Sequence, residues 1–152
     1  MKKSYTILNK EDFRRFSDQG SQSSLSFSSQ LVLRDRIIGL DGLKKKLLIS
    51  ESKDRGTSYS IIELDKVKSV SVKKSYTGIK AGELDKRTFE EFTRSIQLFF
   101  EYYDGTEEII PIYETELDEP SNLPRLEKMV RKWQVILTKM IRTNKDTQPV
   151  IA

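Results

Sequence analysis

The chain has 152 residues and a formal net charge of +4, with 27 Lys or Arg against 23 Asp or Glu, and it contains neither cysteine nor histidine. Without cysteine, a disulfide framework and a thiolate metal site are excluded. Without histidine, the commonest general base and metal ligand is missing, so Ser–His and Cys–His nucleophiles are excluded as well. A chain of this length can still bury roughly two-thirds of its unfolded surface in one core.

The N-terminal part predicts one short helix followed by a polar segment. Residues 9–16 form an amphipathic stretch in which Asn9 can act as the N-cap. The serine-rich run 17–30 fits a flexible linker, but apolar side chains occupy alternate positions from Leu25 to Leu33, so a first strand can begin inside it. The sequence leaves both alternatives open.

Strand signals dominate the middle of the chain. Apolar residues that alternate or run together predict seven strands, at residues 25–33, 36–40, 43–51, 58–64, 67–76, 95–103 and 106–114. Asp41-Gly42 and Asp104-Gly105 are strong hairpin signals, and Pro111 predicts an edge strand or a bulge because it cannot donate to a strand ladder. Consecutive strands are therefore expected to pair in order as one meander.

The segment 77–93 interrupts this pattern with two glycines and an incomplete helical stretch. A long connection in a compact domain is usually either functional or mobile. Phe89 and Phe92 are then candidate contacts for a protein partner, exposed on the connection. The alternative is a loop that only joins two strands.

Residues 122–142 predict an amphipathic helix that can cover a sheet by itself. Ser121 or Asn122 can cap it, and Pro124 fits its first turn. Its apolar residues recur three or four apart and form one stripe: Leu123, Leu126, Met129, Val130, Trp133, Ile136, Leu137, Met140 and Ile141. Trp133 lies at the centre of the stripe and is predicted to be a structural anchor.

Together these elements predict an α+β fold, mainly an antiparallel β barrel or sandwich of about seven strands with a C-terminal amphipathic helix as its cap. The phrase IIELDKVKSVSV at 61–72, Trp133 in the last helix and the order of the elements resemble the pleckstrin-homology-like fold over roughly residues 30–142. The chain is also similar to uncharacterised bacterial proteins of this architecture, Bacteroidetes proteins among them. The predicted parts are an N-terminal segment 1–24, a main domain 25–143 and a flexible tail 144–152.

Charge is segregated along the chain. Residues 31–80 hold 12 Lys or Arg and six Asp or Glu, whereas residues 81–121 hold three and 12. The basic part can face an anionic membrane, or it can be a solvated outer face. The candidate anion or membrane contacts are Lys44, Lys45, Lys46, Lys73 and Lys74. The resemblance implies headgroup binding by position only for the first three, and their tight turn departs from the long loop of lipid-binding relatives.

Two further residue sets have a structural and a functional interpretation. The aromatic residues Phe99, Phe100, Tyr102, Tyr103 and Tyr113 suit a base-stacking platform or a core, and the acidic residues beside them would repel phosphate, which argues for the core and against nucleic acid. The carboxylate pairs at 90–91, 107–108 and 114–119 match no calcium loop, so no metal or other cofactor is expected.

The sequence therefore favours a non-enzymatic binding module that is recruited to a protein partner or to an anionic membrane surface. The alternative is a hydrolase that uses carboxylates or a metal ion. The chain has no stretch of about 18 apolar residues, so no transmembrane segment is expected. A cytoplasmic protein is predicted, with attachment to the membrane periphery left open.

Overall fold

The computed structural model describes residues 8–53, 56–85 and 87–147. The chain divides into two compact units, unit 1 from Met1 to Lys66 and unit 2 from Val67 to Ala152. In the described part of each unit, the chain forms one antiparallel sheet and one α-helix, together with short 3-10 turns. The predicted α+β class and the C-terminal helix are therefore confirmed.

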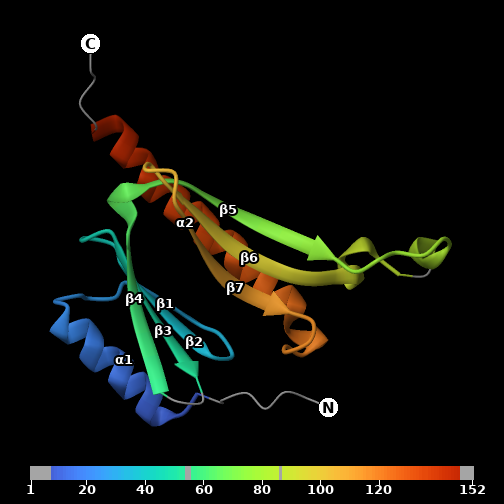
Figure 1. The fold of residues 1–152 in the computed structure, drawn as a ribbon, viewed down its shortest axis with the longest axis horizontal. Helices are drawn as coiled ribbons and strands as arrows, with labels where there is room; N and C mark the ends of the chain where they lie inside the picture. Colours follow the sequence, from blue (N-terminus) through green and yellow to red (C-terminus); the bar gives the residue numbers. More distant parts are fainter. Residues whose placement is uncertain (1–7, 54–55, 86, 148–152) are drawn as a thin grey trace. The chain divides into compact units, whose positions relative to one another are not determined.

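Unit 1 is a four-stranded sheet with a helix on one face (Figure 1). Its elements are α1 (Lys10–Gln22), β1 (Ser29–Val32), β2 (Arg36–Asp41), β3 (Lys46–Lys53), β4 (Gly56–Glu63) and the turn η1 (Leu64–Lys66). The strands pair in sequence order. Helix α1 extends six residues into the serine-rich segment 17–30, so the prediction of a flexible linker is wrong for that part. The first strand is also shorter than the predicted 25–33.

Helix α1 packs on the sheet through aromatic rings and two glycines. The rings of Phe16 and Phe27 are stacked, with 4.9 Å between their centroids. A Cβ atom at Gly20 would lie 2.7 Å from the Phe27 ring, and one at Gly39 would lie 2.6 Å from the same ring. Both positions therefore need glycine, because the helix and strand β2 approach this ring too closely for a larger residue.

The hairpin between β2 and β3 is organised by the buried carboxylate of Asp41. This carboxylate accepts the backbone N–H groups of Lys44 at 2.9 Å, Ser26 at 2.9 Å and Leu43 at 3.0 Å. These hydrogen bonds hold the pKa of Asp41 below its ordinary value, although burial acts to raise it. The predicted hairpin is confirmed, but its turn spans four residues and uses a positive φ of 55° at Lys45.

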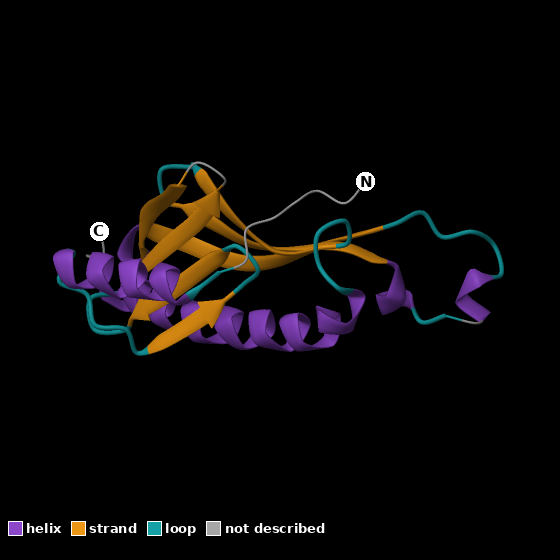
Figure 2. Cartoon of the chain, turned by 90° about the horizontal axis from the view of Figure 1, so that it is seen from below, coloured by secondary structure: helices purple, strands orange, loops and turns teal. Residues whose placement is uncertain are grey.

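Unit 2 is a three-stranded sheet with the order β5-β6-β7 and the long helix α2 against it. Its elements are β5 (Val67–Tyr76), η2 (Glu83–Asp85), η3 (Phe89–Phe92), β6 (Thr93–Tyr102), β7 (Glu107–Glu114), η4 (Pro120–Asn122) and α2 (Leu123–Thr147). The connection that carries η2 and η3 projects beyond the ends of the strands (Figures 1 and 2). The predicted connection at 77–93 is thus confirmed.

The two sheets are separate. Strand β4 leads through η1 into β5, but among the described residues β4 and β5 do not pair. The prediction of one continuous meander is therefore wrong at this point, and of the predicted barrel or sandwich the barrel is contradicted because the two sheets do not close. Strand β7 is at the edge of its sheet, and a register shift between Ile96 and Gln97 places an extra residue beside Pro111. The predicted bulge is confirmed.

Helix α2 runs along the three strands of unit 2 (Figure 2). The residues that it buries are spaced by three or four: Leu126, Val130, Trp133, Leu137 and Ile141. Ile136 was predicted on this stripe, but 40% of it is exposed, so the buried stripe is narrower than the sequence pattern indicates. The helix continues to Thr147, which makes the first four residues of the predicted tail helical. Residues 148–152 lie outside the described residues.

Trp133 is 6% exposed, and we expect Trp133→Ala to lower the free energy of unfolding by about 3–5 kcal/mol, because truncation of a buried aromatic loses transfer energy and leaves a cavity. Chemical denaturation followed by circular dichroism measures the loss. The control is Val135→Ala on the same helix, where 53% of the side chain is exposed and a change below about 0.5 kcal/mol is expected. Equal effects of the two substitutions would contradict the anchor role.

The Asp41 carboxylate predicts an acid-dependent loss of stability. Because its pKa in the folded state lies below the ordinary value of 3.8, its stabilising effect is present above that pH and is lost as the pH falls through the folded-state pKa. Asp41→Asn should therefore be less stable at neutral pH and lose less stability below about pH 4. Urea denaturation over a pH series measures this, with Asp65→Asn, at an exposed position of η1, as the control. If the unfolding free energies of wild type and Asp41→Asn fell in parallel as the pH is lowered, the lowered pKa of Asp41 in the folded state would be contradicted.

Candidate functional site

Unit 2 contains an open cavity of about 690 Å³. It lies where the connection before β6, the end of β7 and the first turns of α2 meet. The apolar part of its wall comes from Tyr113 on β7, from Pro120 in η4, and from Leu123 and Pro124 at the start of α2. This volume falls within the range of about 300–1,000 Å³ that is usual for ligand pockets.

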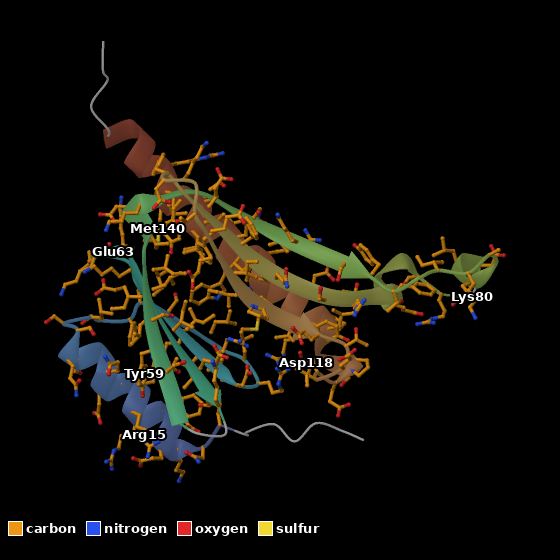
Figure 3. The ribbon with its side chains drawn as sticks, viewed as in Figure 1. Arg15, Tyr59, Glu63, Lys80, Asp118 and Met140 are labelled. Carbon is orange, nitrogen blue, oxygen red and sulfur yellow. The ribbon has the colours of Figure 1, made fainter. Side chains whose placement is uncertain are left out.

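Hydrogen bonds at the end of β7 shape the rim of the cavity. The hydroxyl of Thr115 lies 3.0 Å from the carbonyl oxygen of Thr93 and 2.8 Å from that of Arg94. It therefore donates its hydrogen bond to the backbone. The carboxylate of Asp118 accepts the N–H of Glu114 at 2.8 Å and turns the chain from β7 toward η4 (Figure 3). Helix α2 then begins directly after η4, with its opening turn beside the cavity.

An ion pair lies under the first turns of α2. The Nζ atom of Lys74 on β5 is 2.5 Å from Oε1 of Glu127, and their side chains are only 15% and 19% exposed. Arg131, which is 63% exposed, lies 3.0 Å from the same oxygen. Lys74 holds the pKa of the Glu127 carboxyl below its ordinary value; burial opposes this effect and Arg131 adds to it. Glu127 is therefore a paired carboxylate and not a free acid.

A second set of paired charges lies on the connection before β6. Arg87 Nε is 3.1 Å from Oε2 of Glu91, and its guanidinium carbon lies 4.3 Å from the centre of the Phe92 ring. Phe92 is only 3% exposed. The prediction of Phe92 as an exposed partner contact is therefore wrong, because the ring is buried under Arg87. The side chain of Phe89 lies outside the described residues. Lys80, further out on the connection, is exposed (Figure 3).

The five predicted basic contacts fall in different units and have different surroundings. In unit 1, Lys44 donates from Nζ to the carbonyl oxygen of Ser24, beside the almost fully exposed tip residue Leu43. Lys45 belongs to the same turn. Lys46 lies opposite Glu63 in the strand register of β3 and β4.

In unit 2, the Nζ atom of Lys73 lies 3.7 Å from the centre of the Phe99 ring, and Lys74 is in the ion pair with Glu127. Of the five aromatic residues considered for the core, Phe99, Phe100 and Tyr113 are buried, Tyr102 is half-buried and Tyr103 is 41% exposed, so the core prediction is confirmed in part.

No metal site is evident in the described part of the chain, because no three acidic side chains there come together in a way that could hold an ion. None of the helices in that part is long and apolar enough to cross a membrane. Comparison of the chain with protein-family models, with curated proteins and with solved structures found no match. The resemblance to pleckstrin-homology-like domains therefore stays a prediction.

The cavity itself was not predicted from the sequence. Its wall joins residues of β7, η4 and α2 with the connection before β6, and no local pattern shows that these segments meet. The only sequence signal near it is the pair of prolines at 120 and 124, which frame the start of the long helix.

We expect Lys74→Met to lower the free energy of unfolding by about 2 kcal/mol, because it removes the closer cation and leaves the Glu127 carboxylate partly buried. Arg131→Met is the matched control, since Arg131 contacts the same oxygen but is mostly exposed, and it should cost at most about 0.5 kcal/mol. Urea denaturation of both variants measures the difference. Equal losses of unfolding free energy in the two variants would show that the partly buried contact with Lys74 stabilises the fold no more than the exposed contact with Arg131.

Proposed function

We propose that this chain is a non-enzymatic binding module that recruits a protein partner by receiving an apolar segment of that partner in the cavity of unit 2. The observation that carries this proposal is the 690 Å³ cavity whose charged lining residues, Arg87, Glu91 and Glu127, are each in an ion pair within the chain. The order of the elements, antiparallel strands followed by one long helix, supports a pleckstrin-homology-like architecture for the module, with its two sheets separate.

The charges around the cavity favour an apolar occupant. Glu127 is paired with Lys74, and Glu91 is paired with Arg87. The Thr115 hydroxyl donates a hydrogen bond to backbone carbonyl groups. A charged ligand would have to displace one of these partners, whereas an apolar ligand gains about 25 cal/mol for each Å² of apolar surface that leaves water.

The exposure of the rim favours a protein segment over an enclosed small molecule. Pro120, Pro124 and Thr115 line the cavity and are exposed, so its mouth is open to solvent beside α2. A polypeptide that places one or two apolar side chains in the cavity can therefore continue beyond it on both sides. Small ligands, in contrast, are usually buried over most of their surface.

The chemistry of the lining supports a binding role more than a catalytic one. The chain supplies neither histidine nor cysteine. The two carboxylates at the cavity, Glu91 and Glu127, each have a cationic partner. General acid–base catalysis needs a carboxyl with a pKa near the working pH, and the pairing of Glu127 moves its pKa in the opposite direction.

Leu123→Asp tests the proposal, because it places a charge on the cavity wall. An acidic residue in the first turn of a helix is electrostatically favourable, and Leu123 is already half-buried, so the melting temperature should change little. We expect the variant to lose at least tenfold in capture of the partner from a lysate of the native cells, measured by quantitative mass spectrometry. Ser121→Asp, an exposed position of η4 that does not line the cavity, is the matched control and should keep the partner.

Three results would contradict the proposal. The first is the same set of captured proteins for wild type, Leu123→Asp and Ser121→Asp. The second is a small apolar molecule that native mass spectrometry finds on the wild type and not on Leu123→Asp. The third is a divalent cation that raises the melting temperature of the wild type, which would favour the hydrolase alternative instead.

A further inference from the structure

The charged side chains that α2 exposes between Leu123 and Arg142 are all basic. The exposed side chains between Leu123 and Arg142 include six cations: Arg125, Lys128, Arg131, Lys132, Lys139 and Arg142. They lie opposite the buried stripe, because an α-helix turns by about 100° per residue. Glu127 is the only acidic residue in this stretch of sequence, and it is paired with Lys74 on the sheet side. The face therefore carries a positive charge without interspersed negative charge.

Among the side chains that the structure describes, only one acidic group lies close to this charge. Arg131 lies 3.0 Å from Glu127 and is partly compensated. Lys128, Lys132, Lys139 and Arg142 make no ion pair with any residue whose side chain the structure describes. Four like charges along one side of a rigid helix repel one another, and an anionic surface opposite them would relieve this repulsion.

Two apolar residues lie in the middle of the basic face. Val135 is 53% exposed and Ile136 is 40% exposed. Lys132 precedes them by about one turn and Lys139 follows them by about one turn, on the same side of the helix. Single exposed apolar residues are ordinary. Here, however, the pair is framed by cations above and below, which is the pattern of helices that lie in a membrane interface.

We propose that the solvent face of α2 binds an anionic lipid bilayer. Val135 and Ile136 enter the headgroup region, and the surrounding Lys and Arg side chains extend to the lipid phosphates with their aliphatic stems along the interface. Exposed Val135 and Ile136 favour lipid over nucleic acid as the ligand, because a phosphate backbone has no apolar surface against which these side chains could be buried. The surface is distinct from the cavity, so the inference does not rest on the protein-recruitment proposal.

Co-sedimentation of the full chain with vesicles tests the inference. We expect binding to phosphatidylcholine vesicles that contain phosphatidylserine, no binding to pure phosphatidylcholine, and weaker binding as salt is added. The double variant Lys132→Gln, Lys139→Gln should lower the partition coefficient about 25-fold, since each cation near an anionic membrane contributes about fivefold. The charge-matched control is Lys44→Gln, Lys45→Gln in the β2–β3 turn, which should bind as the wild type does.

A second variant separates lipid from other anions. Val135→Ser, Ile136→Ser leaves every charge in place and changes only exposed side chains, so folding should be kept and vesicle binding should fall about tenfold. Wild-type binding by this variant would overturn the lipid assignment in favour of a polyanion that contacts charges alone. Loss of binding by the β2–β3 turn variant, with retention by the α2 charge variant, would place the contact on unit 1 and overturn the inference. Melting temperatures confirm that each variant is folded.

Discussion

Unit 2 depends on the burial of one helical stripe against one face of a three-stranded sheet. A sheet of three strands needs an apolar cover, and α2 supplies it through a stripe that includes Val130, Trp133 and Leu137. This burial fixes the rotation of α2 about its own axis. The cations and the pair Val135 and Ile136 face solvent because they lie on the opposite side of the same helix. The basic face is thus a geometric consequence of the core.

The apolar stripe alone does not fix where α2 lies along its axis, because a stripe with a spacing of three and four can shift by one turn and still be buried. The ion pair of Lys74 and Glu127 resists such a shift. A movement of one turn, about 5.4 Å, would separate the two charges, leaving Glu127 with only the exposed Arg131 and Lys74 partly buried without this carboxylate. Pairs of this kind often add little net stability, because desolvation offsets their attraction, so we infer that this pair acts mainly by favouring one position of α2 over its neighbours. The pair thereby holds the first turn of α2 beside the end of β7, where the cavity forms.

The parts of the fold that could be predicted are those with local signals: the Asp-Gly hairpins, the bulge at Pro111 and the long amphipathic helix. The break between the sheets has no local signal, because β4 and β5 both carry strand patterns and pairing depends on distant residues. The candidate site was harder to predict from the sequence, because its contacts also join residues that are far apart in the chain. Lys74 is a surface cation by sequence, since its partner Glu127 lies 53 positions away. Phe92 belongs to an irregular segment, where no periodicity distinguishes a buried ring from an exposed one.

The cavity and the basic face lie on one rigid helix but do not compete for it. Leu123 at the cavity and Val135 on the basic face are 12 residues apart, which corresponds to about 18 Å along the helix axis. Their ranges of action also differ. Charge acts across about 8–10 Å of salt solution, whereas an apolar cavity acts only on contact. An anionic bilayer would therefore attract the chain before any partner enters the cavity, and the cavity would then select among the proteins present at that surface.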